Sequence, residues 1–162
     1  MTCAGKAFAA VLLCFVMAAP SQSPEPRRFK RQLSPGETDI TNITLAANQF
    51  LHIEVLQSGH DVAVALREPG GRVVVESDIG NGAYGPETVV FVAETSGSYS
   101  LEIKLGDLQA EPGDCEINIL SVHKATAQDI KIVAAYRLFY QAERWRRDRS
   151  PAAPAHCDRR IC

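Results

Sequence analysis

The sequence of 162 residues lacks the signatures of most enzymes. Its four histidines show no metal-ligand spacing, and no acidic segment follows the Asp-x-Asp-x-Asp-Gly pattern of a calcium loop. Ser58, His60 and Asp61 contain the letters of a catalytic triad. Neighbours in one turn cannot arrange a base, its orienting group and an oxyanion site, so we expect no catalytic residue here.

Cysteine is too sparse for a disulfide framework. Cys3 and Cys14 belong to the N-terminal leader described below, which leaves three of the five cysteines, an odd number. Cys115 is expected to be a small buried apolar group. Cys157 and Cys162 can form a disulfide in an oxidising compartment, or stay free.

Clustered positive charge is missing from the middle of the chain. Residues 33–130 hold 15 acidic and four basic side chains, a net charge of −11, although the whole chain has a net charge of −2. Phosphate contacts need clustered lysine and arginine, so this acidic body argues against nucleic-acid binding. Residues 137–162 hold seven bases and three acids. This basic end is either a solvated helix end and tail or a contact surface for an anionic partner.

Long apolar runs are absent except at the N-terminus. Lys6 precedes the apolar segment 7–19, and the small residues Ala19 and Ser21 form a pattern typical of a cleavage site. The apolar segment is too short for a transmembrane span. We therefore predict a signal peptide over residues 1–21, export to the periplasm or the cell exterior, and no transmembrane segment.

Short alternating apolar runs fill the middle of the chain, and turn residues separate them. Residues 22–32 hold two prolines and five charges, which predicts a linker. Glu68-Pro69-Gly70-Gly71 is a strong hairpin signal, because proline presets φ and glycine accepts a positive φ. The pattern predicts a mainly β fold, an antiparallel β-sandwich or jelly roll of seven or eight strands over residues 33–125. The expected strands are 38–45, 50–57, 61–67, 72–76, 88–93, 99–105 and 115–122.

After residue 125 the apolar period changes to that of a helix, predicted over residues 126–149. Thr126 and Asp129 have the spacing of a capping box. This amphipathic helix is too apolar around its girth to be free in water, so it needs the sandwich or another helix as a partner. Residues 150–162 are expected to be a disordered tail. One apolar stripe consists of Ile130, Ala134, Leu138, Ala142 and Trp145, and a second of Ile132, Tyr136, Phe139 and Tyr140.

Three carboxylates form a candidate calcium site. Asp61, Asp78 and Glu87 lie at strand ends or beside the glycine-rich loop 78–86, so the sandwich can bring them to one end. Ca²⁺ takes about six to eight oxygen ligands, and an acidic loop can supply some of them. The alternative is a solvated acidic loop. Tyr84 in this loop is an exposed aromatic residue that either contacts a ligand or packs over the end of the sandwich.

An ordered series of short motifs resembles a known bacterial family. The segments are Glu54–Leu66 (EVLQSGHDVAVAL), Pro69–Val73 (PGGRV), Gly85-Pro86-Glu87, Ser96–Tyr99 (SGSY), Pro112-Gly113 and Ala125–Asp129 (ATAQD). They resemble the pre-peptidase C-terminal type of β-sandwich, over roughly residues 33–145. In particular they are similar to the version that follows the signal peptide in exported proteins with tetratricopeptide repeats and a caspase-like CHAT domain. Cys115 departs from the pattern, because the family usually has an aromatic residue there.

The resemblance implies a non-enzymatic, exported accessory or binding module. We expect it to be the head of a larger repeat-containing protein, with a protein partner or a downstream helical-repeat domain. The family's peptidase residues lie downstream, so none is carried over. One alternative is the regulatory N-terminal part of a CHAT-type peptidase. Another is a calcium-dependent binder of carbohydrate or protein. No other cofactor is implied.

Overall fold

The computed structural model describes residues 27–149 except 81, 108 and 110. The predicted signal peptide, residues 22–26 of the predicted linker and the predicted tail with Cys157 and Cys162 lie outside the described residues. The described elements are β1 (Arg27–Leu33), β2 (Asp39–Leu45), β3 (Gln49–Ser58), β4 (Val62–Arg67), β5 (Val73–Ser77), β6 (Tyr84–Val92), β7 (Gly97–Leu105), β8 (Gly113–Lys124) and α1 (Ala127–Arg149).

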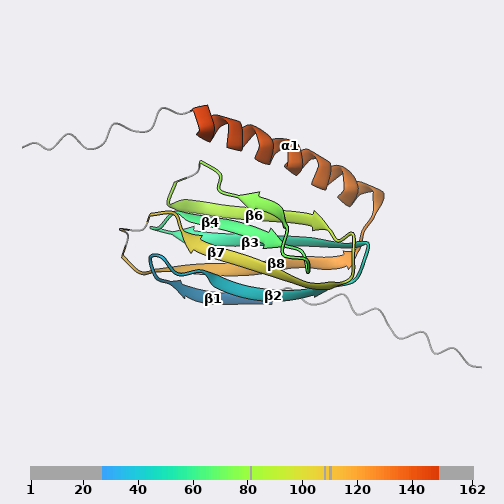
Figure 1. Cartoon of the computed structure of the whole chain (residues 1–162), viewed down its shortest axis with the longest axis horizontal. Coiled ribbons are helices and arrows are strands. Elements are labelled where there is room, and N and C mark those ends of the chain that lie inside the picture. The colour runs from blue at the N-terminus through green and yellow to red at the C-terminus, as the bar shows by residue number, and fades with distance from the viewer. Residues whose placement is uncertain (1–26, 81, 108, 110, 150–162) are drawn as a thin grey trace, which may run out of the picture.

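The strands form two antiparallel sheets that face each other (Figure 1). One sheet has the order β1-β8-β3-β6 and the other the order β2-β7-β4-β5. The predicted β-sandwich is therefore confirmed, with eight strands and one C-terminal helix. The helix lies along the edge where β6 ends the first sheet (Figure 1). It is not long and apolar enough to cross a membrane, and no other helix occurs in the described part of the chain.

Alternation of apolar and polar residues builds the core between the sheets. In β3, Leu51, Ile53 and Val55 point inward and are fully buried, while the residues between them face the other side. Leu66 on β4 and Ile117 on β8 meet them from the two sheets. Such burial of one strand face against another is the dominant favourable contribution to folding.

The prediction of a linker over residues 22–32 is wrong for residues 27–32, which belong to β1. This strand pairs along its whole length with β8, and Phe29 lies opposite Ile117. Phe29 packs against the core, and Leu33 is buried. The sandwich thus begins before residue 33. Arg28 and Lys30 face away from the core, so two of the charges that suggested a linker lie on the exposed face of an edge strand, where charge also discourages pairing with another chain.

The hairpin between β4 and β5 has the predicted turn. The amide of Gly71 donates to the carbonyl oxygen of Glu68 at 2.8 Å, and Gly71 has a φ of 83°. The turn also contacts the β6–β7 connection, because a Cβ atom at Gly97 would lie 2.5 Å from Pro69 Cγ. Glycine is therefore needed at both positions, at Gly71 for its backbone angle and at Gly97 for space.

The helix begins with the predicted capping box. Asp129 Oδ2 accepts hydrogen bonds from the Thr126 amide at 2.8 Å and from the Thr126 hydroxyl at 2.6 Å. In return the Asp129 amide donates to Thr126 Oγ1 at 3.2 Å. These bonds hold the pKa of Asp129 below its usual value, and His123 on β8 lies 3.0 Å from the same carboxylate oxygen. The start of α1 is therefore tied to the end of the last strand.

Further along the helix, in its fourth turn, α1 is held by Tyr140. Its hydroxyl donates to the carbonyl oxygen of Thr88 on β6 at 2.5 Å, and its ring joins the main core. Nearer the start of α1, Val133 packs with Phe50 and Val90 on the outer face of the β1-β8-β3-β6 sheet. The helix therefore folds back onto the sandwich through the stripe that contains Tyr136 and Tyr140.

Replacing Thr126 with alanine should lower the free energy of unfolding by about 1 kcal/mol, because the first turn of α1 loses its cap. Urea denaturation measures the change. Thr44→Ala is the matched control, since Thr44 is an exposed β2 residue, and it should change stability by less than about 0.5 kcal/mol. Equal effects of the two substitutions would contradict the role given to the cap.

Candidate functional site

The structure brings the three candidate calcium ligands into electrostatic contact. The nearby carboxylates of Asp78 and Asp61 add to the effect of burial in raising the pKa of Glu87. Burial, and then the charge of Asp78, also raise the pKa of Asp61. Glu87 comes from β6, Asp78 directly follows β5, and Asp61 directly precedes β4. The three acids are thus near enough for the charge of one to influence the pKa of another. What they contact there decides their chemistry.

Glu87 is an entirely buried carboxyl group. The Ser77 hydroxyl donates to its Oε2 atom at 2.6 Å, and the Ile79 amide donates to the same atom at 3.1 Å. Burial raises the pKa of Glu87 from 4.5 to about 7, although these hydrogen bonds act in the opposite direction. The group therefore changes its charge near neutral pH while it holds the chain that leaves β5.

The chain that follows β5 lies under the C-terminal end of α1. Arg147 donates to a carboxylate oxygen of Asp78, and also to the Asp78 carbonyl oxygen at 3.1 Å. The Gly80 amide donates to Glu143 at 3.4 Å, and the Arg146 guanidinium group lies directly against Gly80. Residues 78–80 are thus held between Glu87 on one side and the helix on the other.

These contacts occupy the oxygens that a cation would use. Asp78 is paired with Arg147, and Glu87 accepts hydrogen bonds from Ser77 and Ile79. In the part of the chain that the structure describes, no group of three His, Cys, Asp or Glu residues has the arrangement of a metal site. Calcium binding at Asp61, Asp78 and Glu87 therefore stays a prediction from the sequence.

The other residues singled out in the sequence have plain surroundings. Cys115 is buried, and burial raises the pKa of its thiol to about 11, so it is the small apolar group that was predicted. The His60 ring lies against Gly113 at the start of β8. Tyr84 is 69% exposed, so the alternative that it packs over the end of the sandwich is wrong.

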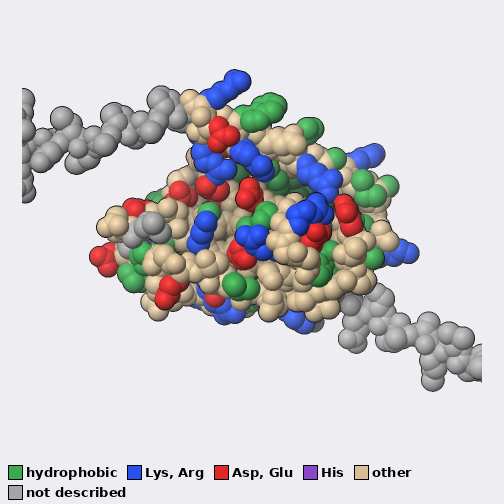
Figure 2. All heavy atoms as spheres, in the orientation of Figure 1, with side chains coloured by type: hydrophobic (Ala, Val, Ile, Leu, Met, Phe, Trp, Pro, Cys, Tyr) green, Lys and Arg blue, Asp and Glu red, His purple; other side chains and the backbone are tan. Residues whose placement is uncertain are grey.

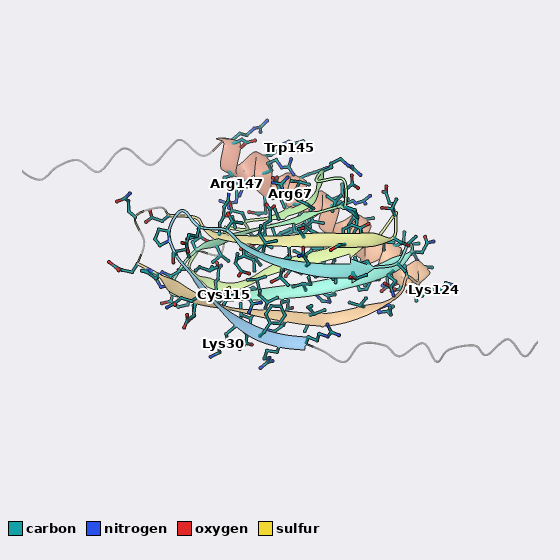
Figure 3. The ribbon with its side chains drawn as sticks, turned by 60° about the horizontal axis from the view of Figure 1, so that its bottom comes forward. Lys30, Arg67, Cys115, Lys124, Trp145 and Arg147 are labelled. Atoms are coloured by element: carbon teal, nitrogen blue, oxygen red, sulfur yellow. The ribbon has the colours of Figure 1, made fainter. Side chains whose placement is uncertain are left out.

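The apolar stripe that contains Ile130, Leu138 and Trp145 lies on the outward face of α1 and is exposed to solvent. Ile130 is 59% exposed, Leu138 68% and Trp145 67%, and Phe139 beside them is 42% exposed. Figure 3 shows Trp145 on the outer side of the helix, while Arg147 reaches toward the sheets. We call the set Ile130, Ala134, Leu138, Ala142 and Trp145 the outer stripe. The helical period in the sequence indicated which residues form this stripe, but it did not indicate that the stripe faces solvent.

Two apolar crevices flank the helix. One has a volume of about 340 Å³ and lies between α1 and the β5–β6 region, where Ile79, Tyr136 and Phe139 line it. The other has a volume of about 510 Å³ and is lined by Val92, Ile130 and Leu138. The outer stripe is therefore continuous with the apolar surface of the second crevice, and contiguous exposed apolar surface is typical of a protein-binding surface.

A polar groove of about 490 Å³ lies on the outer face of the β2-β7-β4-β5 sheet. Its floor includes the small side chains Ala63 and Ala65, and Arg67 pairs with Glu102 along its wall at 2.7 Å. Figure 2 shows acidic and basic side chains interspersed over one face of the molecule below α1. Neighbouring opposite charges in this groove compensate one another, so it presents no strong field of one sign.

Comparisons with known proteins place the fold but not the family. No protein-family model and no curated protein matches the chain. Among solved structures, PliG of Aeromonas hydrophila, described as a periplasmic lysozyme inhibitor of g-type lysozyme, has a TM-score of 0.51 and 13% identity over 61% of this chain and 87% of its own. The pre-peptidase C-terminal domain of Bacillus anthracis collagenase has a TM-score of 0.48 and 22% identity over 61% of this chain and 90% of its own. At these identities the likeness concerns the fold alone.

Glu87 should make stability fall as pH rises. Its folded pKa of about 7 lies above the ordinary value of 4.5, so the folded state holds the proton more tightly. Stability is then highest at mildly acidic pH and decreases until the pH passes about 7. We expect Glu87→Gln to flatten the melting temperature between pH 5 and 8. Glu76→Gln, on the exposed side of β5, should keep the slope, and equal slopes in both variants would refute this assignment.

A calcium site at Asp61, Asp78 and Glu87 has a direct test. If the three carboxylates hold the ion, millimolar Ca²⁺ raises the melting temperature by several degrees, because binding to the folded state stabilises it. Asp78→Asn then abolishes the rise. Differential scanning calorimetry with Ca²⁺ or with a chelator measures it. An unchanged melting temperature rejects the site.

Proposed function

We propose that this chain is a non-enzymatic, exported β-sandwich module that binds a protein partner through the outward face of α1. The observation that carries the proposal is the outer stripe, a row of apolar side chains that a rigid helix presents to water. Large exposed apolar patches on a folded protein commonly mark interaction surfaces. Aromatic residues such as Trp145 are enriched among the residues that dominate binding energy.

The chemistry of the described residues supports a binding role over a catalytic one. The thiol of Cys115 is buried and has a raised pKa, so it is a poor nucleophile. Glu87, the carboxyl group whose pKa lies nearest neutrality, is entirely buried and bonded to Ser77. A sandwich of the same fold serves as a lysozyme inhibitor in Aeromonas hydrophila PliG. We infer that here too the sandwich is a scaffold that positions a binding surface.

Export and the larger context rest on the sequence. The predicted signal peptide over residues 1–21 supports a location in the periplasm or outside the cell. The resemblance to pre-peptidase C-terminal sandwiches supports an accessory head that precedes helical repeats, or the regulatory N-terminal part of a CHAT-type peptidase. Either context would place further helices after α1, whose outward face carries the outer stripe.

The test is recovery of the partner by a tagged protein from the exported fraction of the cells that make it. Leu138→Glu should lower the affinity for the recovered partner at least about tenfold, because burying one leucine side chain stabilises a complex by about 1.5–3 kcal/mol. Ile40→Glu is the matched control, since Ile40 is a 57% exposed apolar residue on β2, at the edge of the sandwich far from α1 (Figure 1). Equal recovery of the same partner by both variants would exclude the outer stripe as the binding surface.

A further inference from the structure

We infer that the outer stripe binds an amphipathic α-helix of another protein whose apolar face is flanked by acidic residues. This inference rests on the proposed function and specifies the partner of the same surface. It is carried by three observations: the shape of the stripe, the charges beside it, and the composition of the segments of this chain that lie outside the described residues.

The shape of the outer stripe suits a helix. Large residues (Ile130, Leu138, Trp145) alternate with the small residues Ala134 and Ala142, at steps of four, four, four and three. These steps keep all five residues on one face of a helix with 3.6 residues per turn, within an arc of about 120°. A row of knobs separated by small residues lets a second helix insert its own side chains between them. The 23 residues of α1 make a rod about 34 Å long, enough for several turns of contact.

The charges beside the stripe are positive. Residues 127–149 hold six basic and three acidic side chains. Two of the acids are engaged, Asp129 with Thr126 and Glu143 with Arg146, and so are three of the bases: Arg146, Arg144 with Glu76, and Arg147 with Asp78. Lys131 and Arg137 are exposed beside the stripe, and no ion pair within the described residues involves either of them. A helix with acidic flanks would supply the missing counter-charges, which favours it over a neutral or basic one.

The same charges disfavour a second copy of this chain. In an antiparallel pair of α1 helices, Lys131 near the start of one helix would face the basic end of the other, which carries Arg149. Residues 150–162 contain two prolines and have a net charge of +1, and residues 1–26 contain one acid and one base, so neither segment has the composition of an acid-flanked amphipathic helix. We therefore assign that helix to a protein partner rather than to either segment.

Trp145 is the one tryptophan of the sequence and belongs to the outer stripe, so its fluorescence reports on this surface. The probe is a synthetic 23-residue helical peptide without tryptophan, with a Leu/Ala stripe and glutamate flanks. Its twin has the same stripe and lysine flanks. We expect the glutamate peptide to shift Trp145 emission to shorter wavelengths and to bind at least about tenfold more tightly than its twin at low salt. The preference should shrink at high salt.

A charge-reversed variant makes the test specific. Lys131→Glu with Arg137→Glu changes two exposed side chains that do not touch the core, and should transfer the preference to the lysine peptide. Leu138→Glu should abolish binding of both peptides. Equal binding of the two peptides would contradict the inference that the partner helix has acidic flanks, but it would leave the proposal of a protein-binding surface standing. Binding of neither peptide, or a concentration-dependent dimer in which Trp145 is already shielded, would overturn the inference in full.

Discussion

The position of α1 depends on two attachments that lie far apart along the helix. Asp129 of the capping box ties the first turn to His123 on β8, and the buried Tyr140 ties the fourth turn to Thr88 on β6. Because a helix is stiff over this length, two attachments set both its direction and its rotation about its own axis. That rotation decides which of the two apolar stripes is buried and which faces water.

The helix in turn covers the loop after β5. Residues 78–80 are bonded to Glu87 below and to Glu143 and Arg147 above. Burying a charged carboxylate costs free energy, which is why the pKa of Glu87 is raised to about 7. Above that pH the charged Glu87 side chain destabilises the folded state. Its hydrogen bonds offset part of that cost by ordering the backbone of the loop. Protonation of one buried group is thereby linked to the place where sheet and helix meet.

The sandwich itself says little about activity, because sandwiches of this fold serve unrelated roles. What distinguishes this chain is the helix packed along the edge strand β6. The polar groove on the other sheet has its opposite charges paired, as Arg67 is with Glu102. The outer stripe is different, since its apolar residues are unshielded and its basic neighbours Lys131 and Arg137 are exposed. We assign binding to α1 because the outer stripe exposes apolar side chains beside basic residues that are unpaired within the described part of the chain, whereas the polar groove does not.

The sequence by itself determined the strands, the turn at Gly71 and the helix with its cap, because each depends on periods of two or of about three and a half residues and on local turn chemistry. It could not identify β1, since a strand of mostly charged residues is recognisable only through its pairing with β8. It singled out Asp61, Asp78 and Glu87 as neighbours, but it could not indicate that Arg147, 69 residues further along the chain, pairs with Asp78. Only the tertiary structure decided which helix stripe is exposed. Both stripes are apolar, and the choice depends on where Tyr140 and Val133 find space on the sheet.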